Sequence, residues 1–337
     1  MHAAPALFRR CASVDESCLR SAYCRPPPIP PLGTSLVQYS HSRLSSFENC
    51  PQQFEYRYIQ KIEVEGEGIE AFLGKRVHEI LERLYHHLGR HGRPPSLSQV
   101  QKRFAQDWEL HWHDKIRIVR TEREPGHYLQ QGERCLENYY RSHYPFEEGQ
   151  TVALEKPISF QLDPEGRYRM RGIIDRLTRQ SDGTYEIHDY KTSGFLPPLS
   201  RLEKDRQLAL YQIGIEQSFP DSERIELVWH YLVFNKTLRL RRTREQLEDL
   251  GARTIQLIDQ IEASSSYPAN PGPLCRWCDY REICPSALLP ASDAGNASSE
   301  RTPPPEPTGS LHAVPATPSQ ATTPRPPAED AVQLSLL

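Results

Sequence analysis

The stretch EIHDYKTSG, residues 186–194, sets an acid and a lysine two positions apart where a strand runs into a glycine-containing turn. Side chains two apart in a strand point to the same side, so Asp189 and Lys191 share one face with Ile187. The apolar neighbour indicates that this is the inner face. The pattern therefore places an acid and a base together against the protein's core.

The composition is that of an ordinary soluble protein. The chain has 337 residues, 37% hydrophobic and 25% charged, enough for one large domain or two small ones. No apolar run approaches the ~20 residues of a membrane helix, so we expect a cytoplasmic protein without a membrane partner. The net charge of −3 gives no global basic field, so any contact with nucleic acid must be local.

The two ends of the chain differ from its middle. Residues 1–34 lack the apolar core of a secretory signal, and Asp15 and Glu16 argue against a transit peptide. We interpret this segment as a disordered extension or an overcalled start site. Residues 286–332 are rich in Pro, Ser and Thr and predict a disordered tail, which ends in an apolar cluster at 333–337.

The region between the ends alternates between helical and strand periodicity. Helical patterns cover 42–59, interrupted by Pro51, then 70–88 and 97–143. Three strands at 151–163, 167–179 and 184–193 are joined by the turns DPEGR and SDG. A helix, two strands and a last helix follow at 203–217, 224–235, 237–243 and about 244–262. This order predicts a mixed α/β domain over 35–285, in which a small mixed sheet is flanked by helices and a helical insertion spans about 86–145.

A hairpin of the second and third strands would bring Asp175, in RGIIDRL, beside Asp189 and Lys191. Two carboxylates suit a hard divalent cation such as Mg²⁺ or Mn²⁺, which polarises a phosphoryl oxygen. The lysine can orient or help deprotonate the attacking water and offset developing negative charge. The alternative is a cross-strand salt bridge without chemistry.

Two helical patterns carry further candidates. His78, in GKRVHEIL, is either another metal ligand or a structural histidine. Gln207 and Tyr211, in RQLALYQ, lie four apart on one helix face. That face either hydrogen-bonds the lysine or DNA phosphates, or is ordinary protein surface.

The series GKRVH, GIIDRL, DYKTS and QLALY resembles the RecB-like branch of the PD-(D/E)XK nucleases over residues 38–285. The resemblance implies a restriction-endonuclease-like core with a metal held by His78, Asp175, Asp189 and the Tyr190 carbonyl. It also implies that Lys191 is catalytic and that Gln207 and Tyr211 shape the site. Glu155, in ALEKPISF, is a candidate auxiliary acid.

Four cysteines are set apart by their spacing, which joins Cys50 to the triplet Cys275, Cys278 and Cys284 in LCRWCDYREICP. Without an export signal a disulfide framework is not expected. The spacing favours an iron–sulfur cluster, with zinc or unrelated thiols as alternatives. The iron–sulfur subgroup of the family, which includes the AddB C-terminal nuclease and CRISPR-adaptation nucleases, has the same arrangement. That resemblance implies a 4Fe–4S cluster acting as a structural staple across a long loop.

Basic and aromatic residues suggest where DNA would lie. Four arginines in TLRLRRTRE form either a phosphate-binding ridge or a solvated strand face: Arg239, Arg241, Arg242 and Arg244. Other candidates for a basic groove are Arg43, Arg57, Lys61, Lys75 and Arg76. Trp108, Trp112 and Tyr128 either stack on unpaired bases or belong to the core.

The leading hypothesis is a metal-dependent DNA nuclease of repair or recombination, an exonuclease on single-stranded or processed ends. A CRISPR-adaptation nuclease and a non-catalytic DNA-end-binding scaffold are the alternatives. No Walker phosphate loop is present, so helicase activity would need a separate partner. The terminal QLSLL resembles the peptide by which DNA enzymes dock on the β sliding clamp, through Gln333, Leu334, Leu336 and Leu337. The alternative is an accidental apolar terminus.

Overall fold

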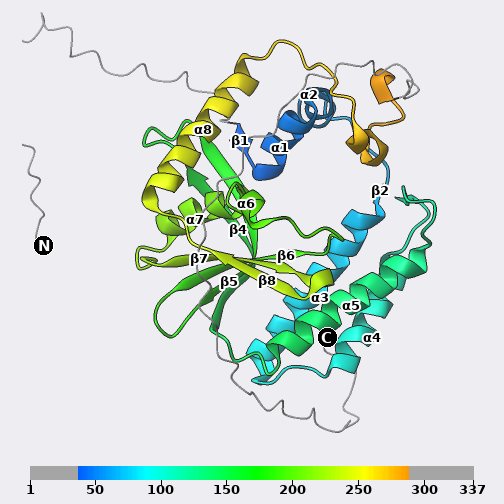
Figure 1. Cartoon of the computed structure of the whole chain (residues 1–337), viewed down its shortest axis with the longest axis vertical. Helices are drawn as coiled ribbons and strands as arrows, with labels where there is room; N and C mark the ends of the chain where they lie inside the picture. The colour runs from blue at the N-terminus through cyan, green and yellow to red at the C-terminus, as the bar shows by residue number, and fades with distance from the viewer. Residues whose placement is uncertain (1–36, 288–337) are drawn as a thin grey trace, which may run out of the picture. The chain divides into compact units, whose positions relative to one another are not determined.

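A six-stranded mixed sheet organises the computed structural model, which describes residues 37–287 (Figure 1). The strands run in the order β1, β5, β6, β7, β8, and β4 also pairs with β5. β4, β5 and β6 form antiparallel pairs, β6 and β7 are parallel, and β8 returns antiparallel to β7. The bounds are β1 Gln38–Tyr39, β4 Gln150–Gln161, β5 Arg169–Arg179, β6 Tyr185–Lys191, β7 Ile225–Tyr231 and β8 Lys236–Leu240.

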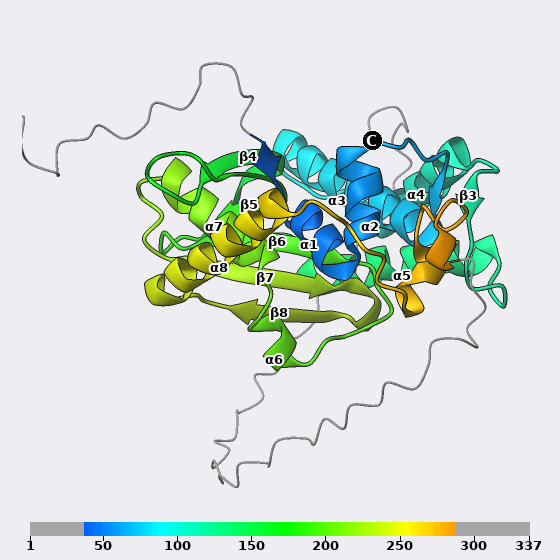
Figure 2. The same ribbon diagram turned by 90° about the horizontal axis from the view of Figure 1, so that it is seen from above.

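Helices cover both faces of this sheet (Figures 1 and 2). One side carries α1 His41–Asn49, α7 Gln207–Ser218 and α8 Arg244–Ala263. The other carries α3 Ile69–His91, α4 Leu97–His111 and α5 Pro125–His143. Shorter elements are α2 Pro51–Phe54, the π-helix Glu55–Ile59, α6 Leu199–Leu202, the pair β2 Glu67–Gly68 and β3 Ile116–Arg117, and 3₁₀ turns at Leu232–Phe234, Pro273–Trp277 and Pro285–Ala287. The predicted mixed α/β domain with a sheet flanked by helices is confirmed.

Local signals in the sequence explain most helix ends. Ser40 caps α1 by accepting a hydrogen bond from the Arg43 N–H, at 3.2 Å. Pro51 stands at the first position of α2, where its missing N–H costs nothing, so the helical stretch restarts there as predicted. The segment 97–143 is two helices rather than one continuous run, because Pro125 begins α5 after a loop that contains β3.

The sheet separates two apolar cores. Tyr185 and Ile187 of β6 pack with Trp229 of β7 and with α1, α7 and α8. Tyr190 faces the other core with α3, α4 and α5, where Cys135 is fully buried. Because β6 is covered on both faces, alternate residues of EIHDYK enter different cores and nearly all of them are buried.

The chain divides into two units, Met1–Val37 and Gln38–Leu337, and all elements named above belong to the second. Residues 1–34, most of the predicted tail 286–332 and the terminal peptide 333–337 lie outside the described residues. Among residues 37–287, no helix combines the length and apolar composition that crossing a membrane requires.

Candidate metal centre and active site

An imidazole from α3 and carboxylates from β4 and β5 converge on one point. His78 Nδ1 lies 3.5 Å from Asp175 Oδ2 and 3.9 Å from Glu155 Oε1. One ligand atom from each of these residues lies within 4.8 Å of the others, and no other group of three or more His, Cys, Asp or Glu side chains in residues 37–287 does so. A nitrogen and two carboxylates are a donor set that divalent cations such as Mn²⁺ accept.

Glu155 reaches this point through an irregularity in β4. Its φ is +41°, in the left-handed region that a non-glycine residue seldom adopts. The flanking residues remain in register, since Leu154 pairs with Arg176 and Lys156 with Ile174, so Glu155 stands opposite Asp175. A strained residue inside a strand is a common way to re-aim a side chain toward a site.

The backbone of Tyr190 holds two of these groups. Its carbonyl lies 2.9 Å from His78 Nε2, and its N–H donates to Asp175 Oδ2 at 2.8 Å. If Nε2 carries the proton, Nδ1 presents its lone pair to the two carboxylates. Metal-binding histidines usually donate their second N–H to a carbonyl in this way. The structure thus places the Tyr190 carbonyl behind the imidazole, where it orients His78.

The two carboxylates are held at an energetic cost. Burial, and after it the charge of the neighbouring Asp175, raises the pKa of Glu155 to about 7. The pKa of Asp175 is raised to about 6, chiefly by burial; His78 acts against the shift and Asp189 contributes to it. Crowded, desolvated carboxylates favour any cation that neutralises them. This electrostatic pattern is characteristic of functional sites.

Asp189 belongs to a second, adjacent group. Lys191 Nζ lies 2.7 Å from Asp189 Oδ2 and donates to Gln207 Oε1 at 3.1 Å. Gln207 Nε2 donates in turn to Asp189 Oδ1 at 3.1 Å, which closes a triangle between β6 and α7. Burial acts to lower the pKa of Lys191, but Asp189 and other nearby carboxylates outweigh it and the pKa is raised. The lysine is therefore an ammonium group at neutral pH, suited to orienting water or stabilising negative charge.

Tyr211 of α7 packs against a glycine of β5. A Cβ added to Gly172 would lie 2.2 Å from Tyr211 Cε1, so the ring occupies the space that any other residue would need. Gly172 is three residues ahead of Asp175 in GIID, and Tyr211 is four residues after Gln207. The packing of Tyr211 on Gly172 therefore sets how closely α7 approaches the strand that carries Asp175.

Two neighbours of the site were not predicted from the sequence. Burial lowers the pKa of His41 to about 4, and the charges of Arg206 and Lys191 act in the same direction, so this imidazole is neutral. Asp205, just ahead of α7, has a pKa raised by burial and then by Asp189. An aspartate just ahead of a predicted helix is a recognisable sequence signal, because it often accepts hydrogen bonds from the first backbone N–H groups of the helix. Asp205 does so here, accepting from the Leu208 N–H at 3.4 Å. His41 has no such signal.

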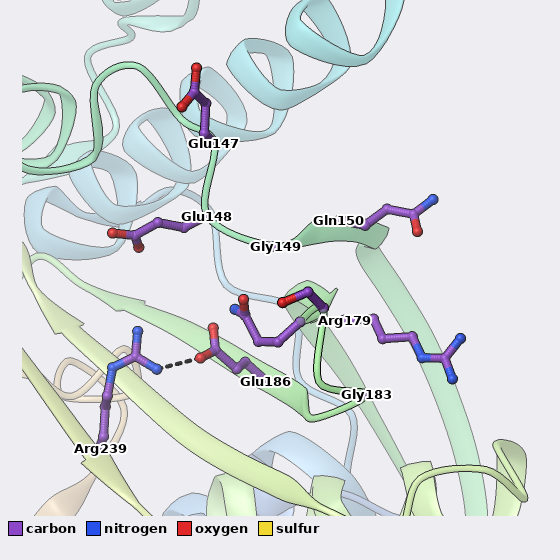
Figure 3. A pocket seen from close by; sticks show the side chains of 10 residues that line it. Glu147, Glu148, Gly149, Gln150, Arg179, Gly183, Glu186 and Arg239 are labelled. Atoms are coloured by element: carbon purple, nitrogen blue, oxygen red, sulfur yellow. Dashed lines mark hydrogen bonds and ion pairs between the residues drawn. The ribbon is translucent and has the colours of Figure 1, made fainter.

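Two cavities differ in their relation to these residues. The smaller cavity, of about 400 Å³, opens beside His78 and Glu155. Its lining also includes Gly74, Lys75, Glu79 and Glu82. A larger one of about 800 Å³ lies at the other end of β5 and β6, around Arg179 and Glu186 (Figure 3). Arg239 there pairs with Glu186 rather than pointing into open space (Figure 3). The larger cavity contains none of the predicted catalytic residues, so size alone does not mark the site.

The basic and aromatic candidates for DNA contacts are mostly engaged elsewhere. Arg239 and Arg241 both pair with Glu226, and Arg244, the first residue of α8, pairs with Glu248. Arg242 donates to the Leu202 carbonyl, and Arg76 is buried beside Asp107. Trp108 and Tyr128 are core residues, and Trp112 packs against the same core.

The four cysteines of interest come from two segments that lie together in space. The Asn270 N–H donates to Cys50 Sγ at 3.4 Å, and the Asn270 side chain donates to the Asn49 carbonyl at 3.0 Å. The segment is also tied to the rest of the protein through Asp279, which accepts from Arg117 at 2.8 Å. Within residues 37–287, no three cysteine sulfurs lie within 4.8 Å of one another.

Carboxylates and a lysine on neighbouring strands of a mixed sheet, with a histidine from a flanking helix, are suited to metal-assisted hydrolysis of phosphodiesters. A comparison with protein families matches residues 38–285 to the PD-(D/E)XK nuclease superfamily. The match covers most of the chain, which therefore belongs to this superfamily.

Two further comparisons are less informative. No curated protein matches the chain. A solved structure described as "Crystal structure of SSO0001" shares 15% sequence identity, covers 77% of this chain and 90% of its own, and aligns with a TM-score of 0.32.

Proposed function

We propose that this protein is a divalent-metal-dependent deoxyribonuclease, an exonuclease that degrades single-stranded or processed DNA ends during repair or recombination in the cytoplasm. The observation that carries the proposal is the adjacency of two groups: a metal-binding group of His78, Glu155 and Asp175, and a triangle of Asp189, Lys191 and Gln207. Asp175 and Asp189 lie on neighbouring antiparallel strands, and the charge of Asp189 contributes to the raised pKa of Asp175.

The residues present fit Mg²⁺ or Mn²⁺. Two carboxylates and one imidazole supply hard oxygen and borderline nitrogen donors, and burial raises the pKa of both carboxylates, an effect that a bound cation would oppose. A bound cation would polarise the phosphoryl oxygen and make water a better nucleophile. Asp189 stands next to this group and, with His78 and Asp175, is one of the ligands that the family resemblance implies.

Lys191 acts on the substrate as a charged group. Its ammonium is fixed by Asp189 and Gln207, so its direction is set before substrate arrives. A preorganised cation of this kind stabilises charge as it develops on the phosphoryl oxygens. Gln207 is a positioning residue, since it contacts both Lys191 and Asp189.

The test is digestion of oligonucleotides labelled at the 5′ or the 3′ end, single-stranded or duplex, with Mg²⁺, Mn²⁺ or EDTA. We expect metal-dependent shortening from one end, abolished in Lys191→Met. Lys236→Met, at an exposed lysine of β8, is the matched control and should digest like the wild type. Equal digestion by Lys191→Met and the wild type would remove the catalytic assignment.

An iron–sulfur cluster is a second part of the proposal, held by Cys50, Cys275, Cys278 and Cys284. Two of the sulfurs already accept backbone hydrogen bonds, Cys50 from Asn270 and Cys275 from Gly272, each at 3.4 Å. Such N–H contacts are typical around cluster sulfurs. Iron and sulfide analysis of anaerobically purified protein is the test.

The proposed partners are DNA, the β sliding clamp through residues 333–337, and a helicase encoded separately. The clamp proposal rests on the sequence QLSLL alone. Deleting residues 333–337 should abolish co-purification with the clamp and leave nuclease activity unchanged. Clamp binding by the truncated protein would refute this part.

A further inference from the structure

An exposed apolar loop follows the catalytic strand directly. Phe195 is 55% exposed, Leu196 36% and, at the start of α6, Leu199 54%. Large apolar side chains left uncovered together usually mark a binding surface. We call residues 193–199 the Phe195 loop.

The loop is anchored on both sides of its exposed part. Gln131 of α5 donates to the Thr192 carbonyl at 2.9 Å, just before the loop. Leu202, at the end of α6, is 2% exposed, and its carbonyl accepts from Arg242 at 2.8 Å. Inside the loop, Ser193 Oγ donates to the Phe195 carbonyl at 3.3 Å. The apolar side chains are therefore presented on a supported segment.

A cation accompanies the aromatic ring. The Arg201 guanidinium lies over Phe195, with Cζ 5.6 Å from the ring centroid. This arrangement is a cation–π contact. The contact places the positive charge of Arg201 next to the exposed Phe195 ring, so a ligand could contact both.

The short stretch of chain between Lys191 and Phe195 limits how far apart these two residues can lie. Phe195 is four residues after Lys191, and a fully extended chain spans at most about 3.5 Å per residue. The two Cα atoms are therefore within ~14 Å of each other. A nucleotide whose phosphate is at Lys191 would have a neighbouring base within reach of the Phe195 ring.

We propose that Phe195 and Arg201 form a stacking site for an unpaired nucleobase next to the scissile phosphate, which selects single-stranded DNA. This inference rests on the proposed function and specifies its substrate. Aromatic rings stack on any base with ~1–3 kcal/mol, without reading sequence. In a duplex the faces of each base are covered by its neighbours, so the site favours unpaired ends. Arg201 is placed to neutralise a phosphate of the same strand.

The test is binding without cleavage, measured in EDTA by fluorescence anisotropy on a single-stranded 12-mer and on a blunt duplex. Phe195→Ala should weaken single-strand binding about 5- to 150-fold, the equivalent of the stacking energy above, and change duplex binding by less than about twofold. Phe195→Trp should bind single strands like the wild type. Leu110→Ala, which removes a side chain that is 75% exposed on α4, is the matched control and should have no effect.

A spectroscopic readout separates stacking from general loss of binding. A 2-aminopurine base beside the labelled end should be quenched by the wild type and by Phe195→Trp, but not by Phe195→Ala at saturating protein. Unchanged single-strand affinity in Phe195→Ala, or an equal loss on duplex, would overturn the proposal and point to a protein partner for the loop. Binding and quenching without any digestion would instead refute the proposed nuclease function and leave the stacking site standing.

Discussion

Replacing Glu155 by Gln should stabilise the protein in EDTA at pH 8 while weakening its metal binding. The folded protein raises the pKa of Glu155 from 4.5 to about 7, mainly by burial. At 1.36 kcal/mol per pH unit this shift corresponds to roughly 3.4 kcal/mol. The side chain is 32% exposed, and solvent screens the charge, so we expect about 1–2 kcal/mol.

The sign of the pH dependence follows from proton linkage. Between pH 4.5 and about 7 the folded protein holds a proton on Glu155 that the unfolded chain has lost, so stability falls as pH rises through this window. Glutamine cannot ionise, so Glu155→Gln escapes this loss. The variant should match the wild type near pH 4.5 and melt roughly 2–8 °C higher at pH 8 in EDTA.

Bound Mn²⁺ should reverse the order of stability of the wild type and Glu155→Gln. At a Mn²⁺ concentration of 100 times Kd the wild type should gain about 2.7 kcal/mol, and Glu155→Gln should lose most of this gain. Melting curves at pH 8 with EDTA or Mn²⁺, together with calorimetric titration of Mn²⁺, measure both effects. Glu147→Gln, at an exposed glutamate beside the larger cavity, is the control. A variant with wild-type Mn²⁺ affinity, or one destabilised in EDTA at pH 8, would refute the role assigned to Glu155.

Three further predictions test other parts of the structure. Gly172→Ala places a methyl group 2.2 Å from Tyr211 Cε1 and should cost about 1–3 kcal/mol in chemical denaturation, part of which Tyr211→Ala should restore in the double variant. Cys284→Ala should lower both the iron content and the melting temperature, whereas Cys135→Ala, at a buried cysteine outside the set, should keep its iron; equal iron in Cys284→Ala and the wild type would exclude Cys284 as a ligand. Asp189→Asn removes the main carboxylate that keeps Lys191 charged, so the pKa of Lys191 should fall and activity should be lost at a lower pH than in the wild type, which pH–rate profiles would show or contradict.

The sequence predicts the strands of this site better than the position of Glu155. Alternation in EIHDYK predicts a strand with Asp189 and Lys191 on the face of Ile187. The structure has this strand, β6, and pairs it antiparallel with β5, the strand that carries Asp175. Glu155 was only a candidate auxiliary acid, because its approach to His78 depends on a φ of +41° inside a strand. Glutamate has no preference for that conformation, so no local pattern announces it.

Arg239 and Arg241 show a second limit of prediction from the sequence. Alternation correctly places Arg239 in a strand, but β8 ends at Leu240, one residue before Arg241. Arg239 pairs with Glu186 on β6 and Arg241 pairs with Glu226 on β7. Both glutamates lie far from the arginines in the sequence. A strand pattern indicates which residues share a face, but it does not show which neighbouring strand faces them.

The backbone of Tyr190 links the metal-binding group to the far face of the sheet. Its N–H and carbonyl contact Asp175 and His78, whereas its side chain points into the second core, where its hydroxyl lies 3.2 Å from that of Tyr139. On the same face His188 and His230 bond ring to ring at 2.9 Å, and burial keeps the pKa of both far below its usual range, so the pair is uncharged. The buried guanidinium of Arg176 lies 3.4 Å from the His188 ring and disfavours a second positive charge there. The side chains behind β6 therefore support the strand whose backbone orients His78 and Asp175, the candidate metal ligands, so the geometry of the candidate site depends on residues outside it.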